Sequence, residues 1–327
     1  MLSRVAEATY WMSRQVERAE NMGRFIEIAA GLSLEHPDIF VDPWYPLVQA
    51  TGDDKHFTEN YPDNRPSDVV RMLAFDRGYQ SSILTCLSAA RENIRGIRET
   101  VSSELFEHLN ALYHHIVDAE RHFADGWQPD SQWFADLRNR MLMWAGIVDH
   151  TMPRDISWHF MNVGRMLERA DKTTRILDVK YFTLLPKVTD AGSPVDDLQW
   201  SALLLSLSGA EAFRRRHHLT EVDKVVDFIV CDRTFNRSIA FCLARADASV
   251  AEIERLGGAV AEHRTPETIH DLRQRIEAVV PSSIVSTMHE FIDSVQTGLN
   301  VVGDHLRDDY FPRPQVVGDA TAGAAAR

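Results

Sequence analysis

The sequence predicts an all-α fold in which a duplicated helical-bundle module forms a pseudo-symmetric pair. Apolar residues recur about every 3.6 residues along most of the chain. No alternating β-branched run reaches the length of a strand. The pattern Arg-x-x-Glu-Arg-Ala-acid occurs at residues 14–20 and again at 165–171. The first two observations predict helices, and the third predicts that a helical unit is repeated.

The helical periodicity is first visible in residues 2–34, where Met12 and Val16 fall on one side of a helix and Arg14 and Glu17 on the other. Similar patterns predict helices at 80–98, 102–124, 131–150, 156–181, 195–219, 236–257, 266–280 and 282–309. Two segments read as irregular connections, namely 35–66 and 183–194. The tail 312–327 reads as disordered.

Four matches in the same order support the duplication. Arg14-x-x-Glu17-Arg18-Ala19-Glu20 matches the residues from Arg165 onward at an offset of 151 (165 − 14). Trp44-x-x-Leu47 matches Trp200-x-x-Leu203 at an offset of 156, and the segment from Asp76 matches that from Asp232 at the same offset. Asp149-His150 matches Asp304-His305. We expect modules at 1–150 and 151–311, which can share one core because almost no linker separates them.

The composition excludes several classes of protein. The chain of 327 residues has 35 basic and 48 acidic residues and a net charge of −13, which argues against binding nucleic acid or an anionic membrane. Cys86, Cys231 and Cys242 form no Cys-x-x-Cys pair, and Cys86 and Cys242 fall on apolar helix faces, as buried residues do. The first residues do not resemble a signal peptide, and no apolar run is long enough to span a membrane. These features predict a cytoplasmic protein.

The repeated helices carry the residues that predict a site. On each helix two arginines flank a glutamate within a narrow arc opposite the apolar side. The candidate polar cleft comprises Arg14, Glu17, Arg18, Arg24, Arg165, Glu168, Arg169, Arg175, Arg77 and Arg233. If the two arcs face each other, their guanidinium groups form a pocket for a carboxylate or phosphate. The alternatives are an interhelical ion-pair network and a solvated surface. For Arg77 and Arg233, the alternative is a local bridge to the preceding aspartate next to a helix cap.

The sequence indicates no catalytic residue, cofactor or metal. Glycine-rich phosphate loops and Gly-x-Ser-x-Gly motifs are absent. His114, Asp118 and His122 recur on one helix face, but a metal site in a helical bundle requires carboxylates from several helices. Glu267-x-x-His270 has no second copy at the matching place. We therefore expect neither metal nor cofactor.

The repeated motifs resemble a known family. They lie in LSRVAEATYWMSRQVERAENMGR, SSILTCLSAARENIRGIRETVSSELFEHLN, TMPRDISWHFMNVGRMLERADKTTRILDV and VDFIVCDRTFNRSIAFCL. These segments resemble the bacterial alpha-E family, an all-helical domain with a characteristic Glu-Arg motif, which falls here on Glu17-Arg18 and Glu168-Arg169. Members of that family occur beside, or fused to, a circularly permuted ATP-grasp protein, often with a transglutaminase-like protease. The resemblance implies a role in an amide-ligase or peptide-modification system.

These observations lead to one functional hypothesis and two alternatives. The protein is expected to be a helical accessory or substrate-binding component of an ATP-grasp ligase system, without catalytic activity of its own. Its paired Glu-Arg helices would then bind an acidic or peptide substrate or dock the ligase. One alternative is an independent enzyme in which Glu17 or Glu168 acts as a general base. The other is a purely structural scaffold.

Overall fold

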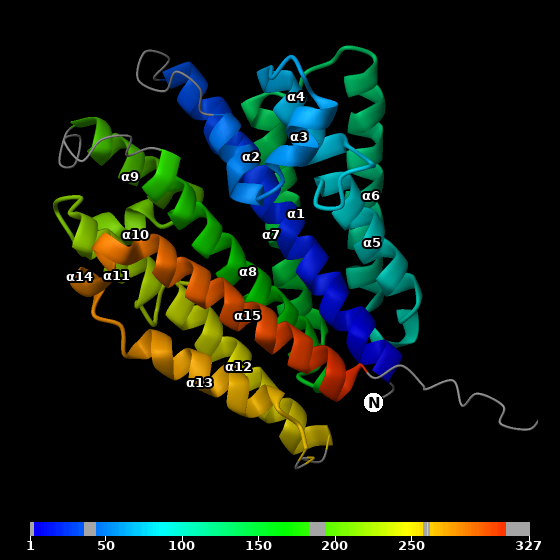
Figure 1. The fold of residues 1–327 in the computed structure, drawn as a ribbon. Helices are drawn as coiled ribbons and strands as arrows, with labels where there is room; N and C mark the ends of the chain where they lie inside the picture. Colours follow the sequence, from blue (N-terminus) through cyan, green and yellow to red (C-terminus); the bar gives the residue numbers. More distant parts are fainter. Residues whose placement is uncertain (1–2, 36–43, 184–193, 258–259, 261, 312–327) are drawn as a thin grey trace, which may run out of the picture.

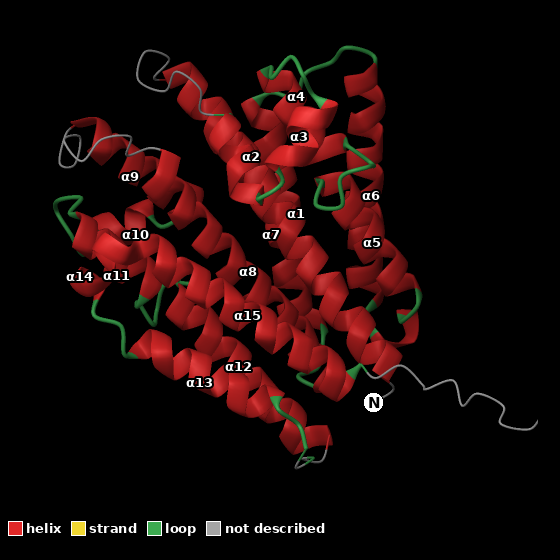
Figure 2. Cartoon of the chain, viewed as in Figure 1, coloured by secondary structure: helices red, strands yellow, loops and turns green. Residues whose placement is uncertain are grey.

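The computed structural model describes residues 3–35, 44–183, 194–257, 260 and 262–311. Figure 2 shows helices joined by loops and no strand among these residues. The predicted all-α class is thereby confirmed for the part of the chain that the structure describes. The predicted tail 312–327 and most of the predicted connection 183–194 lie outside it.

The helices are as follows. The first half contains α1 (Ser3–Glu35), α2 (Tyr45–Thr51), α3 (Asp54–Asn60), α4 (Pro66–Val70) with a π-helical continuation (Arg71–Phe75), α5 (Ile83–Arg95), α6 (Ser103–Ala124) and α7 (Ser131–Thr151). The second half contains α8 (Ile156–Thr183), α9 (Pro194–Ser206), α10 (Ala210–Arg214), α11 (Val222–Val230), α12 (Ile239–Gly257), α13 (Thr265–Glu277), α14 (Pro281–Ile284) and α15 (Met288–Tyr310). Most of the predicted long helices are present, with ends shifted by a few residues, whereas the helix predicted at 282–309 is divided into α14, a short 3-10 turn and α15.

Helices α1 and α8 pack along each other in the middle of the molecule (Figure 1). On one side, α5 and α7 pack against α1, and α6 packs against both α5 and α7. On the other side, α12 and α15 pack against α8, and α13 packs against both α12 and α15. The two long central helices therefore have neighbours that occupy corresponding places in the order of the chain.

The buried apolar residues form two cores, and the central helices contribute to both. Ala6 and Tyr10 of α1 belong to the core of the second half. Trp158 and Met161 of α8 belong to the core of the first half. Each half therefore relies on the central helix of the other to cover its apolar residues.

Gly164 lies where the two central helices approach each other closely. A Cβ atom at this position would lie 2.4 Å from the backbone oxygen of Tyr10. A side chain there would force the helices apart, so glycine allows α8 to lie directly on α1. Glu168 follows this contact by about one turn of α8, and Glu17 follows it by about two turns of α1.

Some local predictions differ from the structure. The segment 35–66 was read as irregular, yet it contains α2 and α3, and the unpredicted α11 lies at Val222–Val230. The predicted helix 195–219 is interrupted after Ser206. There Ser208 adopts a positive φ of 52° and Gly209 lies against aromatic rings that leave no room for a Cβ. Short helices and such breaks depend on packing and have little periodicity of their own.

Ser82 and Ser238, which match each other at the offset of 156, act as helix caps. Ser82 Oγ accepts a hydrogen bond from the backbone N–H of Thr85 at 3.1 Å, and Ser238 Oγ accepts one from that of Phe241 at 3.0 Å. These bonds satisfy backbone donors at the starts of α5 and α12. The local bridges considered between Asp76 and Arg77 and between Asp232 and Arg233 do not form, because each arginine pairs with a glutamate of another helix.

Candidate functional site

The carboxylate of Glu168 on α8 is buried beneath two arginines of α1. Arg18 donates to it twice, from Nε to Oε1 at 2.6 Å and from Nη2 to Oε2 at 3.0 Å. Arg14 donates from Nε to Oε2 at 2.8 Å. The side chain of Glu168 has no exposed surface, whereas each arginine keeps 19% of its own. The guanidinium groups therefore shield the acid from water.

Glu17 of α1 and Arg169 of α8 form the reciprocal pair. Arg169 donates from Nε to Oε1 at 2.7 Å and from Nη2 to Oε2 at 2.8 Å. The glutamate of each Glu-Arg dipeptide thus accepts two hydrogen bonds from the arginine of the other dipeptide. Among side chains, arginine is the one that can donate two such parallel bonds to a carboxylate. We call Glu17, Arg18, Glu168 and Arg169 the crossed Glu-Arg pairs.

Arg237, just before α12, extends this network on the side of Glu17. Its Nη2 donates to Oε2 of Glu20 at 2.7 Å, and its Nη1 lies 3.5 Å from Oε1 of Glu17. Arg24 also donates to Glu20, and it donates to the hydroxyl of Ser208. Glu20 and Arg237 were missing from the predicted site. For Glu20 the acid in the repeated motif was an available signal, but nothing in the sequence links Arg237 to a helix 220 residues away.

A lysine supplies the corresponding charge on the side of Glu168. Lys172 Nζ lies 3.7 Å from Oε1 of Glu168 and 3.2 Å from Oδ2 of Asp171. Arg175 donates from Nε to Asp171 at 3.0 Å and from Nη1 to the backbone oxygen of Thr51 at 3.2 Å. Arg237 thus adds positive charge beside Glu17 and Glu20, and Lys172 adds it beside Glu168 and Asp171.

The network keeps the carboxylates of Glu168 and Glu20 ionised. Burial by itself raises the pKa of Glu168, but Arg18 and Arg14 outweigh this effect and bring the pKa well below its ordinary value. The same balance, with Arg237 and Arg24 as the cations, lowers the pKa of Glu20 to about 2. A general base near neutral pH needs a much higher pKa. Glu168 and Glu20 are therefore held as structural anions.

Arg165 is the exception on the polar face of α8. Its Nη2 donates to Oδ1 of Asn162 at 3.1 Å, while its buried Nε has no partner in the described structure. Burial, together with the charge of Arg169, lowers the pKa of Arg165. No carboxylate among the described residues forms an ion pair with it. A poorly solvated cation that is not ion-paired favours the binding of an anion.

Arg165 borders a cavity of about 640 Å³ that involves α1, α7, α8 and the region from α9 to α12. We call it the arginine cavity, after the arginines that line it: Arg24, Arg165, Arg169, Arg216, Arg237 and Arg245. The acid in its described lining is Asp149, which pairs with Arg154 at 3.1 Å. Three residues of the predicted cleft, Arg24, Arg165 and Arg169, line this cavity.

The other predicted residues are divided between the network and the outer surface. Arg14, Glu17, Arg18, Glu168 and Arg175 belong to the network described above. Arg77 and Arg233 do not join it. Arg77 Nε donates to Glu120 on α6 at 2.6 Å, and Arg233 Nη2 lies 3.1 Å from Glu277 on α13. Their side chains are 61% and 68% exposed, because the loops before α5 and α12 direct them toward outer helices.

Comparison with known families shows which family the chain belongs to. A family described as "a predicted alpha-helical domain with a conserved ER motif" matches residues 1–311. The chain belongs to the Alpha-E family. This confirms the resemblance seen in the sequence, and both Glu-Arg dipeptides of the crossed pairs lie within the matched range of the Alpha-E domain.

Relatives of this Alpha-E protein include uncharacterized proteins of Mycobacterium bovis and Mycobacterium tuberculosis. Each is 20% identical, over 93% of this chain and 36% of the relative. The chain therefore spans little more than a third of the length of these relatives. No solved structure shows a significant match.

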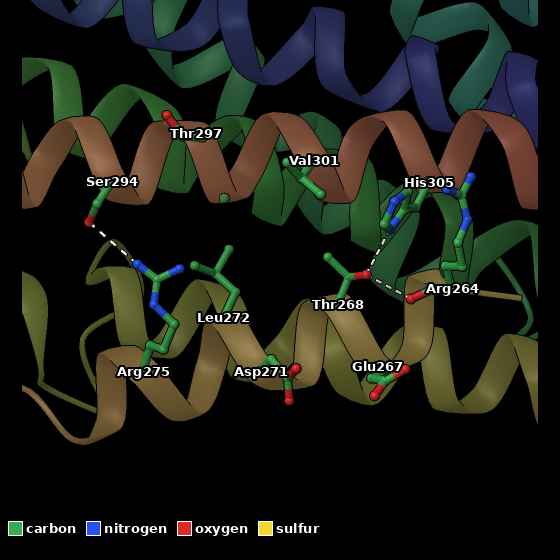
Figure 3. A pocket seen from close by; sticks show the side chains of 11 residues that line it. Arg264, Glu267, Thr268, Asp271, Leu272, Arg275, Ser294, Thr297, Val301 and His305 are labelled. Atoms are coloured by element: carbon green, nitrogen blue, oxygen red, sulfur yellow. Dashed lines mark hydrogen bonds between the residues drawn. The ribbon is translucent and has the colours of Figure 1, made fainter.

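A second hollow in this Alpha-E domain, of about 610 Å³, lies between α13 and α15 (Figure 3). At one end Arg275 lies 3.5 Å from the hydroxyl of Ser294, and at the other Thr268 lies 2.7 Å from His305 Nδ1. Its lining includes charges of both signs: Arg264, Glu267, Asp271 and Arg275. It lacks the excess of positive charge that distinguishes the arginine cavity, and none of the predicted site residues line it.

Three further properties concern the described Alpha-E residues. No three of their His, Cys, Asp or Glu side chains lie together in a way that would hold a metal ion. None of their helices combines the length and the low polarity needed to cross a bilayer. Cys86 and Cys242 are buried, as expected, and burial raises the pKa of each thiol to about 12.

Proposed function

We propose that this protein is the substrate-binding component of an ATP-grasp-linked amide-ligase or peptide-modification system. In this proposal the arginine cavity binds a carboxylate of an acidic or peptide substrate. The observation that carries it is Arg165, which faces a cavity of about 640 Å³ without an anionic partner among the described residues. A cavity of this size accommodates a small organic ligand or a short peptide.

The charges around the cavity support an anionic ligand. Four of its arginines pair with three carboxylates, those of Glu17, Glu20 and Asp232. Arg165 and Arg245 have no such partner in the described structure. This local excess of positive charge occurs in a chain whose net charge is −13. It therefore does not follow from the general composition.

The protonation state of the network favours a binding role over catalysis by the Glu-Arg residues. An enzyme that used Glu168 as a general base would need to expose this carboxylate and raise its pKa. Glu168 is instead fully buried, and its arginine partners lower its pKa. The crossed Glu-Arg pairs thus support the role of a rigid frame beside the cavity.

A purely structural scaffold is the second candidate, because the crossed pairs satisfy each other. That candidate accounts for Glu17 and Glu168 and their partners. It does not account for Arg165 or for the hydrogen-bonding capacity left on its Nε. A binding site formed on a structural network explains both sets of residues.

We also propose that the two halves arose by duplication, as the repeated motifs predicted. The equivalent neighbours of α1 and α8 support this origin. So do two arginines at corresponding positions: Arg24 reaches Ser208 after α9, and Arg175 reaches the backbone of Thr51 at the end of α2. Ser208 and Gly52 lie 156 residues apart, and both have a positive φ.

The proposed partner is an ATP-grasp ligase, with a transglutaminase-like protein as a possible third component. This part of the proposal rests on the family resemblance. A test is to purify the chain with an ATP-grasp protein encoded nearby and to measure ATP consumption with an acidic peptide and an amine. We expect ATP consumption to be at least tenfold lower with the Arg165→Gln variant than with the unchanged chain. Equal consumption with the variant would contradict it.

Binding by the isolated chain is measured directly by calorimetry with an acetylated peptide that ends in glutamate. Arg165→Gln should weaken binding about tenfold or more, because one charge-assisted hydrogen-bonding group is lost from a partly buried site. The matched control is Arg233→Gln, in which an exposed arginine outside the network is changed. If the unchanged chain does not bind the peptide, the proposed substrate class is wrong.

A further inference from the structure

The two halves differ at the positions that form the arginine cavity. Three of its arginines, Arg216, Arg237 and Arg245, have Asn60, Ser81 and Ala89 at the positions 156 residues earlier. These three arginines of the second half thus lie around one cavity. The three differences add positive charge around the cavity.

A related difference affects Arg14 and Arg165, the first arginines of the two repeated motifs. In the first half, Arg14 lies over the ring of Trp11 and pairs with a glutamate. In the second half, Asn162 stands in the place of Trp11, at the offset of 151, and Arg165 has no carboxylate partner in the described structure. The smaller, polar Asn162 lines the cavity beside Arg165. In the first half, Trp11 and a glutamate thus occupy the surroundings of Arg14. In the second half, the corresponding space beside Arg165 belongs to the cavity.

Several arginines of the cavity are already neutralised by carboxylates of the protein, which leaves the others to bind the charges of a ligand. Arg237 pairs with Glu17 and Glu20, and Arg216 pairs with Asp232. Such arginines shape the cavity but have their counter-charges already. Arg165 on α8 and Arg245 on α12 form no ion pair in the described structure, and Arg245 is exposed. The cavity therefore offers one partly buried cation and one exposed cation for recognition.

Apart from the arginines and Asp149, the lining combines the polar Asn162, Ser208, Thr234 and Asn236 with a set of apolar side chains. The apolar side chains include Leu142, Ala145, Met166, Leu207, Ala212 and Phe241. Carbon-rich walls between charged positions favour a ligand whose acidic groups are joined by an organic chain. A free inorganic anion would leave these walls unused.

We infer that the ligand is a short peptide with two acidic groups, of which Arg165 binds one and Arg245 the other. This inference rests on the proposed function, because it specifies the substrate class of the same cavity. A C-terminal glutamate fits the description, since it carries its main-chain and side-chain carboxylates on one residue. Arg245 is then a specificity residue, and Arg165 is needed for any acidic peptide.

Calorimetric titration of the full chain with three acetylated tripeptides tests this inference. They are Ala-Leu-Ala amide, Ala-Leu-Ala acid and Ala-Leu-Glu acid, which carry no, one and two carboxylates. We expect the second carboxylate to tighten binding about tenfold, as a charge-assisted hydrogen bond does. Arg245→Gln should abolish that gain and leave binding of the one-acid peptide unchanged. Arg165→Gln should weaken both acids, and Arg233→Gln should weaken neither.

The possible failures are distinguishable. If both acidic peptides bind equally and Arg245→Gln has no effect, the two-acid inference is overturned while the proposed function stands. If none of the peptides binds, both are overturned. Inorganic phosphate that competes as strongly as Ala-Leu-Glu would show that the cavity recognises a phosphoryl group, which also overturns the inference. Thermal unfolding of each variant verifies folding, and Arg245 is exposed enough for its variant to fold normally.

Discussion

Arg18 of α1 donates two hydrogen bonds to Glu168 of α8, at 2.6 and 3.0 Å, across 150 residues of sequence. The preceding residue on α1, Glu17, accepts two bonds from the residue that follows Glu168. The two dipeptides therefore join the central helices with four hydrogen bonds between ionised groups. Because the acids are buried, the stability of the protein depends on both members of each pair.

Glu168→Gln should lower the free energy of unfolding by roughly 3–5 kcal/mol, because the change leaves two partly buried arginines without their shared counter-charge. Urea unfolding followed by circular dichroism measures this. The matched control is Glu120→Gln, whose partner Arg77 is 61% exposed and whose loss should cost less than about 1 kcal/mol. Equal, small losses for both variants would show that the crossed Glu-Arg pairs add no special stability.

Gly164→Ala should destabilise the protein by about 1–3 kcal/mol, because the added methyl group would meet the backbone of α1 at the helix crossing. The same substitution at Gly146 on α7 is the control, since a Cβ there has no atom within 4 Å. It should stabilise the helix by roughly 0.5–1 kcal/mol. Denaturation midpoints of the two variants should therefore move in opposite directions. A stabilised Gly164→Ala variant would contradict the close crossing.

Arg165→Gln and Arg169→Gln should affect stability very differently. Arg169 neutralises buried Glu17, so its loss should cost about 3 kcal/mol or more. Arg165 has no carboxylate partner in the described structure, and burial lowers its pKa. Removing its charge should change the free energy of unfolding by less than about 1 kcal/mol. A large loss for Arg165→Gln in urea unfolding would mean that this arginine has a structural role instead.

Stability should fall with pH in acid partly because of Glu20. The folded pKa of Glu20 is about 2, below the ordinary value, so its stabilisation is complete above the unfolded pKa of about 4.3. As pH falls from there toward 2, it should be lost at roughly 1 kcal/mol per pH unit. Glu20→Gln should make the dependence of unfolding free energy on pH correspondingly less steep, whereas the exposed-site control Glu99→Gln should not. Identical slopes for all three proteins would refute the assignment.

The predicted helices were correct where amphipathic periodicity extends over many residues, as in α1, α6 and α8. The residues that form the crossed Glu-Arg pairs were also in the predicted cleft, because the same four positions recur in both halves. Arg77 and Arg233 recur as well, but each faces an acid on an outer helix. Repetition showed that these residues matter in both halves, without showing which partner each one meets.

The sequence by itself determined the helical class and the polar face on each central helix, since helical periodicity is a property of neighbouring residues. Only the tertiary structure decided that Glu17 meets Arg169, that Arg237 enters the network from a distant loop, and that Arg165 remains without a carboxylate. These pairings depend on how closely α1 and α8 cross at Gly164 and on where the α11–α12 loop ends. Both are set by packing between segments far apart in the chain, and short-range sequence patterns carry no information about such distances.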